Sequence, residues 1–112
     1  MDAKIPKQKD FPLQSAKDVV EYIRNWIEQD GPIRIDAHLK IDRKFRNVST
    51  RDCKYVLAAV TEASLEYPPE RDEKHRNHVL HIHGTDLDGE AVELLCVIDF
   101  KNFTIVVFNW LA

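Results

Sequence analysis

The spacing of apolar residues predicts helices in the first half of the chain and strands in the second. The clearest helical repeat covers residues 15–30, which open with an S-x-x-D pattern at Ser15 and Asp18 and stop before Gly31-Pro32. The hydroxyl can cap a free backbone N–H, and glycine suits the left-handed position after a last turn. The apolar positions fall on one stripe, typical of a helix that faces a core: Ala16, Val19, Val20, Ile23, Trp26 and Ile27.

Two further helices are expected after a short extended link at 33–36. The first covers about 37–46. The second opens at Ser49 and Asp52, which repeat the S-x-x-D pattern. Its apolar stripe consists of Cys53, Val56, Leu57, Val60 and Ala63.

After residue 63 the apolar positions alternate with period two, as in half-buried strands. Turn signals occur at Asp86–Gly89 and at Lys101-Asn102. The pattern predicts a short edge strand at 64–68, a charged turn at 70–77, and strands at 78–85, 90–100 and 103–111. The expected fold class is therefore α+β, with N-terminal helices packed on one face of an antiparallel β-sheet.

The strand at 90–100 has two different faces. One face, expected to receive the helices, carries Val92, Leu94, Cys96, Ile98 and Phe100. The other face is not cleanly polar, because Leu95 and Val97 lie between Glu93 and Asp99. We therefore expect a cover for this second face, and a homodimer is the favoured one, ahead of a protein partner or the N-terminal arm.

Length and composition indicate one α+β domain at 15–112, preceded by an extended arm at 1–14, in a chain of 112 residues. No apolar run is long enough for a membrane span or a secretory signal, so a cytoplasmic location is expected. Cys53 and Cys96 are expected to be small buried hydrophobes. The motifs of phosphate-binding and dinucleotide-binding loops are missing from the sequence, and no cofactor is expected.

The net charge of −3 divides into +3 over residues 1–56 and −6 over residues 57–112. The densest basic stretch, 34–54, suits either a phosphate-binding surface or an ordinary solvated helix face. Within it, His38, Asp42 and Arg46 share one face of the expected helix. His38 there is either a general base beside a cation or a packed ring next to a surface ion pair.

Four histidines precede and enter the strand at 78–85: His75, His78, His81 and His83. Strand alternation places His81 and His83 on one face and Leu80 and Ile82 on the other. A pair of histidines at i and i+2 can chelate a metal, but no cysteine has matching spacing, so no metal site is expected. Tyr67 and Arg76 flank the charged turn and could either touch a phosphate or pack.

Residues 38–49, HLKIDRKFRNVS, resemble the His-x7-Arg-Gly-Ile-Ser signature of an uncharacterised family of small bacterial proteins related to the RelE and BrnT toxins. The resemblance extends over about 35–110 and implies helices on one face of an antiparallel sheet. His38 matches the family's helix histidine and Arg46 its arginine. Asp42 stands where the family usually has another arginine, Arg43 follows one place later, and Asn47 replaces the glycine.

The resemblance implies a possible metal-independent ribonuclease of a toxin–antitoxin pair. In that mechanism His38 or His81 removes the 2′-hydroxyl proton, and Arg43 and Arg46 stabilise the phosphorane. A second histidine, such as His83, protonates the leaving oxygen. The alternative hypothesis is a non-catalytic protein-binding module of the same fold. The acidic second half of the chain favours this hypothesis. Possible partners are thus a second copy, an antitoxin-like protein or RNA, and no membrane.

Overall fold

The computed structural model describes residues 12–36, 48–72 and 77–111. The expected helix at 37–46 and most of the arm at 1–14 lie outside these residues. The described chain has an α+β fold, as the sequence predicts. Its elements are α1 (Ala16–Glu28), β1 (Ile33–Ile35), α3 (Thr50–Ala58), the 3-10 turn η2 (Glu62–Ser64), β2 (Glu70–Asp72), β3 (Asn77–Thr85), β4 (Ala91–Asp99) and β5 (Thr104–Leu111).

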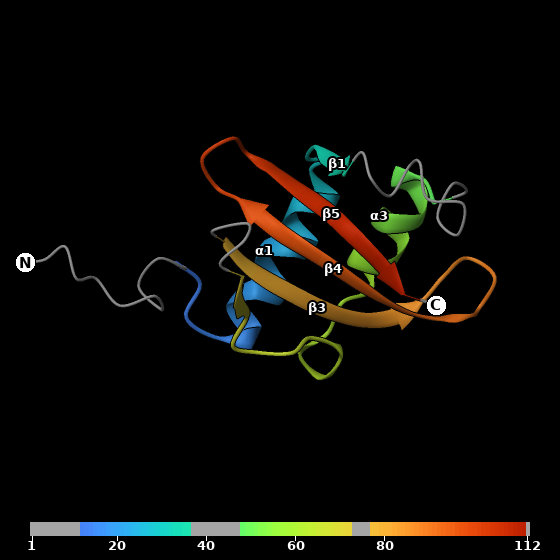
Figure 1. Ribbon diagram of the computed structural model, residues 1–112, viewed down its shortest axis with the longest axis horizontal. Coiled ribbons are helices and arrows are strands. Elements are labelled where there is room, and N and C mark those ends of the chain that lie inside the picture. Colours follow the sequence, from blue (N-terminus) through green and yellow to red (C-terminus); the bar gives the residue numbers. More distant parts are fainter. Residues whose placement is uncertain (1–11, 37–47, 73–76, 112) are drawn as a thin grey trace, which may run out of the picture.

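Five strands form one sheet in the order β1-β5-β4-β3-β2. Helices α1 and α3 lie behind this sheet in Figure 1, both on the same face. The face toward the viewer, called the second face below, carries no helix from the described parts of the chain. No helix within the described ranges is long and apolar enough to cross a membrane.

The expectation of a purely antiparallel sheet is wrong at one edge, because the sheet is mixed. The link at 33–36 contributes β1, which pairs in parallel with β5 through Ile33–Ile105 and Ile35–Val107. The Asp36 N–H donates to the Val107 carbonyl at 2.8 Å and extends this pairing. Burial of Ile35 against the helices accounts for the recruitment of so short a segment.

The two helix starts predicted from an S-x-x-D pattern are confirmed by their caps. The Ser15 hydroxyl accepts from the Asp18 N–H at 3.1 Å, and Ser49 and Asp52 form a reciprocal capping box. The predicted helix end is wrong in one detail, because the left-handed residue is Asp30, with φ 58°, rather than Gly31. Gly31 is needed for another reason: a Cβ there would lie 2.4 Å from the indole of Trp26.

The edge of the sheet differs from the prediction between residues 62 and 72. The expected strand at 64–68 is a 3-10 turn followed by a single bridge from Leu65 to Ile82. The edge strand β2 instead lies within the segment expected to be a charged turn. Pro68 and Pro69 explain the shift, because neither has an N–H to donate and regular pairing resumes only after them.

The core lies between the two helices and the sheet, as predicted. Its fully buried members come from both layers: Val19, Ile23, Cys53, Leu57, Leu80, Ile82, Leu94, Cys96, Ile105 and Val107. Burial raises the pKa of the Cys53 and Cys96 thiols to about 12. Both cysteines are therefore protonated apolar fillers, which confirms the expectation drawn from their positions.

The close approach of Gly31 and Trp26 generates the first prediction. Gly31→Ala should lower the free energy of unfolding by about 1–3 kcal/mol, because the new methyl group overlaps the indole ring. In a Trp26→Ala background the same substitution should cost much less. Urea unfolding of the four proteins measures this coupling. An equal cost of Gly31→Ala in both backgrounds would show that the ring does not cause it.

Candidate functional site

The structure describes only some of the candidate site residues that the sequence suggested. His38, Arg43 and Arg46 lie outside the described residues, as do His75 and Arg76.

His81 and His83 both lie on the second face of β3, as strand alternation predicted. His78 is buried, at 6% exposure, and Tyr67 donates its hydroxyl to the Leu13 carbonyl at 3.0 Å.

His81 lies between two carboxylates that come from the strands on either side of β3. Its Nδ1 is 2.9 Å from Glu93 Oε2, and its Nε2 is 3.1 Å from Glu70 Oε1. Glu93 lies on β4, two residues before Leu95, which pairs with His81, and Glu70 lies on β2. An imidazolium can donate to both carboxylates at once, whereas a neutral ring has only one N–H. The arrangement thus favours the charged form of His81.

The pKa of His81 reflects two opposing effects. Partial burial of the ring penalises its charged form and lowers the pKa. Hydrogen bonds to Glu93 and Glu70, with the nearby charge of Glu66, act in the opposite direction and prevail. The pKa of His81 is therefore raised above its ordinary value of 6.5.

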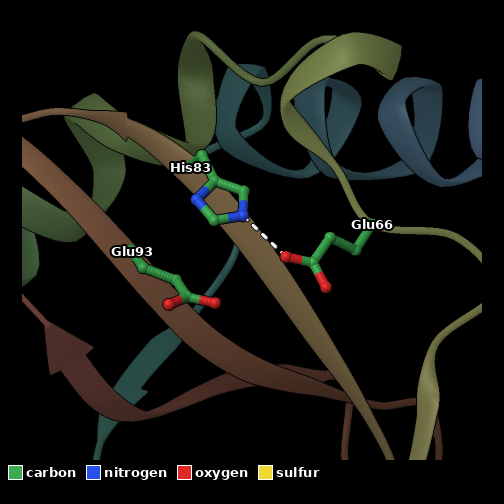
Figure 2. A group of neighbouring side chains, drawn as sticks. All are labelled: Glu66, His83 and Glu93. Atoms are coloured by element: carbon green, nitrogen blue, oxygen red, sulfur yellow. Dashed lines mark hydrogen bonds and ion pairs between the residues drawn. The ribbon is translucent and has the colours of Figure 1, made fainter.

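His83 lies two residues further along the same strand and belongs to a second group. Its Nε2 is 2.7 Å from Glu66 Oε2, and this hydrogen bond lowers the pKa of the Glu66 carboxyl. Glu93 is directly opposite His83 in the β3–β4 pairing. Figure 2 shows both carboxylates directed toward the space beside the His83 ring. One donor atom from each of the three side chains lies within 4.8 Å of the other two.

Backbone hydrogen bonds hold these side chains in place. The Glu66 N–H donates to the His81 carbonyl at 3.1 Å, next to the bridge of Leu65 with Ile82. Regular pairing of β3 and β4 fixes Glu93 relative to both histidines. The site is thus built on sheet positions, although its side chains are partly open to solvent, with Glu66 56% and His83 51% exposed.

Sequence reasoning identified the two histidines but missed Glu66, Glu70 and Glu93. The register of the predicted hairpin turn, if known, would have placed Glu93 opposite His83. Glu66 and Glu70 belong to segments whose structure the sequence did not indicate, because the prolines displace the edge strand. The candidate site is consequently more acidic than two strand histidines alone suggest.

Three carboxylates around two imidazoles give this part of the second face a negative potential above the pKa of His81. Such a surface repels phosphate and attracts cations. Both ring nitrogens of His81 contact carboxylates, whereas His83 contacts Glu66 through Nε2. The arrangement suits cation or protein binding better than phosphate chemistry.

Away from these histidines, one row of residues crosses the second face. Arg34 on β1 pairs with Val106 on β5, and Val106 pairs with Val97 on β4. One step beyond the pair of Leu80 with Cys96, Val79 lies beside Val97, and Val79 pairs with Glu70. The row therefore runs from a cation at the β1 edge, over apolar side chains, to a carboxylate at the β2 edge.

Comparisons of the chain with protein-family models, with curated proteins and with solved structures found no match.

The raised pKa of His81 predicts a pH-dependent contribution to stability. A pKa that folding raises above 6.5 stabilises the folded chain below pH 6.5, and this gain is lost as pH rises through the folded-state pKa. The loss of unfolding free energy in His81→Gln should thus be larger at pH 5.5 than at pH 8.5. Urea unfolding of both proteins at the two pH values measures this loss.

The matched control removes the carboxylates that contact His81. In a Glu70→Gln/Glu93→Gln background both carboxylate hydrogen bonds that raise the pKa of His81 are lost, and burial of the ring, which lowers the pKa, is opposed only by the charge of Glu66. The effect of His81→Gln should then lose its pH dependence or reverse it. An unchanged pH dependence in this background would contradict the assignment to these two carboxylates.

Proposed function

We propose that this chain is a non-catalytic protein-binding module that uses the second face of its sheet and binds a second copy of itself. The observation that carries the proposal is the row from Arg34 through Val106 and Val97 to Glu70, in which Val97 is half-buried and Val106 and Val79 are already buried within the single chain. An apolar centre with opposite charges at its two ends is self-complementary. Leu95 on the same face of β4 adds apolar surface beside the row, and the 43% exposed Leu111 of β5 lies further along this face, opposite Glu93.

A two-fold axis parallel to the strands and above β4 explains the charge pattern. Such an axis lays the β1 edge of one copy over the β2 edge of the other. Arg34 of each copy then faces Glu70 of its partner, and Val97 faces Val97. Isologous pairing of this kind is the commonest form of homodimer.

The size of the face reaches the lower limit for a biological interface. Strands β3, β4 and β5 have nine, nine and eight residues and β1 and β2 have three each, so at about 3.3 Å per residue and about 4.8 Å between strands the face covers about 500 Å² per copy. Two copies would bury about 1,000 Å² in total, the size that a specific interface has to reach. Charged ends around an apolar centre also match the usual distribution of residues in an interface.

Light scattering at micromolar concentration should give about twice the 13.1 kDa mass of the chain. Val97→Lys should shift the mass to that of one chain, because the two-fold axis brings two like charges together at the apolar centre. The matched control is Leu87→Lys, which places the same charge at a 45% exposed leucine in the β3–β4 turn. This control should leave the dimer intact.

Charge reversal tests the proposed orientation of the two copies in the dimer. Arg34→Glu should weaken the dimer, and Arg34→Glu with Glu70→Arg should restore it. A single-chain mass for the unaltered protein at high concentration would contradict self-association and favour a different protein partner. A dimer indifferent to Val97→Lys and Arg34→Glu would place the interface elsewhere.

The alternative function is that of a metal-independent RNA-cleaving toxin with an antitoxin partner. It draws support from the resemblance of residues 38–49 and from the basic stretch 34–54. Three carboxylates next to His81 and His83 weigh against it, because they oppose the approach of a phosphate.

A direct assay separates the two functions. We expect the purified chain to leave a fluorescently labelled RNA intact, at the background rate of a His38→Ala variant. Gel separation of the RNA measures cleavage. Cleavage by the unaltered chain that disappears in both His38→Ala and Arg46→Ala would establish the ribonuclease and overturn the non-catalytic function.

A further inference from the structure

Glu66, His83 and Glu93 bring two carboxylates and one imidazole together from three separate elements. Glu66 follows η2, His83 lies on β3 and Glu93 lies on β4. Their donor atoms lie within 4.8 Å of one another. This group differs from a run of acidic residues on one surface loop, because it includes an imidazole and its members are 10 or more residues apart in the sequence.

We propose that Glu66, His83 and Glu93 bind a divalent first-row transition-metal ion, with Zn²⁺ as the best match. Imidazole nitrogen with carboxylate oxygen is a donor set that zinc and its neighbours accept. Ca²⁺ and Mg²⁺ are excluded as preferred ions, since they select all-oxygen coordination with more ligands. Three protein ligands leave the fourth position of a tetrahedral zinc ion open to water or to a further ligand.

The distances require the donor atoms to move closer together around the ion. Zinc lies about 2.0–2.2 Å from its nitrogen and oxygen ligands, so two donors on one tetrahedral ion are about 3.3–3.6 Å apart. The 4.8 Å limit of the group is within reach by rotation of the exposed Glu66 and His83 side chains. The ion would replace the 2.7 Å hydrogen bond between these two residues.

His81 supplies the supporting contact that metal sites commonly need. Its Nδ1 is 2.9 Å from Glu93 Oε2, and its Nε2 is 3.1 Å from Glu70. Glu93 can therefore use its other oxygen as a ligand while His81 fixes the orientation of the carboxylate. Partners of this kind align ligating carboxylates, and their loss typically weakens metal binding by about 10–100-fold.

Calorimetric titration of the purified full chain with Zn²⁺ tests the site, and Co²⁺ serves as a visible-absorption probe of coordination. We expect one ion per chain. His83→Ala should weaken binding at least tenfold, and Glu66→Gln should also weaken it. His81→Gln should weaken it by about tenfold, as expected for a supporting residue. The matched control, Glu90→Gln, changes an exposed carboxylate in the adjacent turn and should leave binding unchanged.

Two results would overturn the site. One is the absence of Zn²⁺ binding at 100 μM ion, and the other is binding that both His83→Ala and Glu66→Gln leave unaltered. Thermal melts of these variants without metal check that each is folded. The site does not depend on the proposed dimer: Val97→Lys should abolish self-association but retain one ion per chain. A negative result for the dimer would therefore leave the metal site untouched, and a negative result for the metal site would leave the dimer untouched.

Discussion

The register of the β3–β4 hairpin is the constraint on which both the core and the candidate site depend. Asp86 accepts the Asp88 and Glu90 N–H groups on one carboxylate oxygen, each at 2.9 Å. Gly89 supplies the positive φ of 84° that closes the turn. Thr85 then pairs with Ala91. A slip by one residue would turn the apolar positions of one strand away from the helices.

The same register determines the chemistry of the second face. It sets His83 opposite Glu93 and leaves His81 within reach of carboxylates on both neighbouring strands. These groups are adjacent because alternate residues of a strand share a face, while the intervening Leu80 and Ile82 hold that strand against the core. Stability of the core and geometry of the charged group are thus produced by one set of backbone hydrogen bonds.

The second face combines two kinds of surface. A row of valines crosses it between Arg34 and Glu70, and the histidine–carboxylate group lies toward the hairpin end. Glu70 belongs to both, since it ends the row and also contacts His81. Protonation of His81 changes the charge next to Glu70, so the proposed interface and the charged group are electrostatically linked.

The sequence by itself determined the local structure of this protein: the helix starting at Ser15, the capping box at Ser49, the long strands, the two turns and the core-facing row of β4. Each depends on interactions between residues close in the chain, or on a periodicity that a single element must obey. The apolar character of Leu95 and Val97 on the second face was also evident. His81 and His83 were correctly assigned to that face, because alternation along one strand is sufficient for this.

Only the tertiary structure decided which distant residues meet. The recruitment of Ile33–Ile35 as a parallel edge strand depends on burial of Ile35 in a core formed by other elements. The displacement of the edge strand beyond Pro69, and the exact pairing across the hairpin, brought Glu66, Glu70 and Glu93 to the histidines. No local pattern specifies such contacts, because they arise from the packing of segments whose separation in sequence carries no periodic signal.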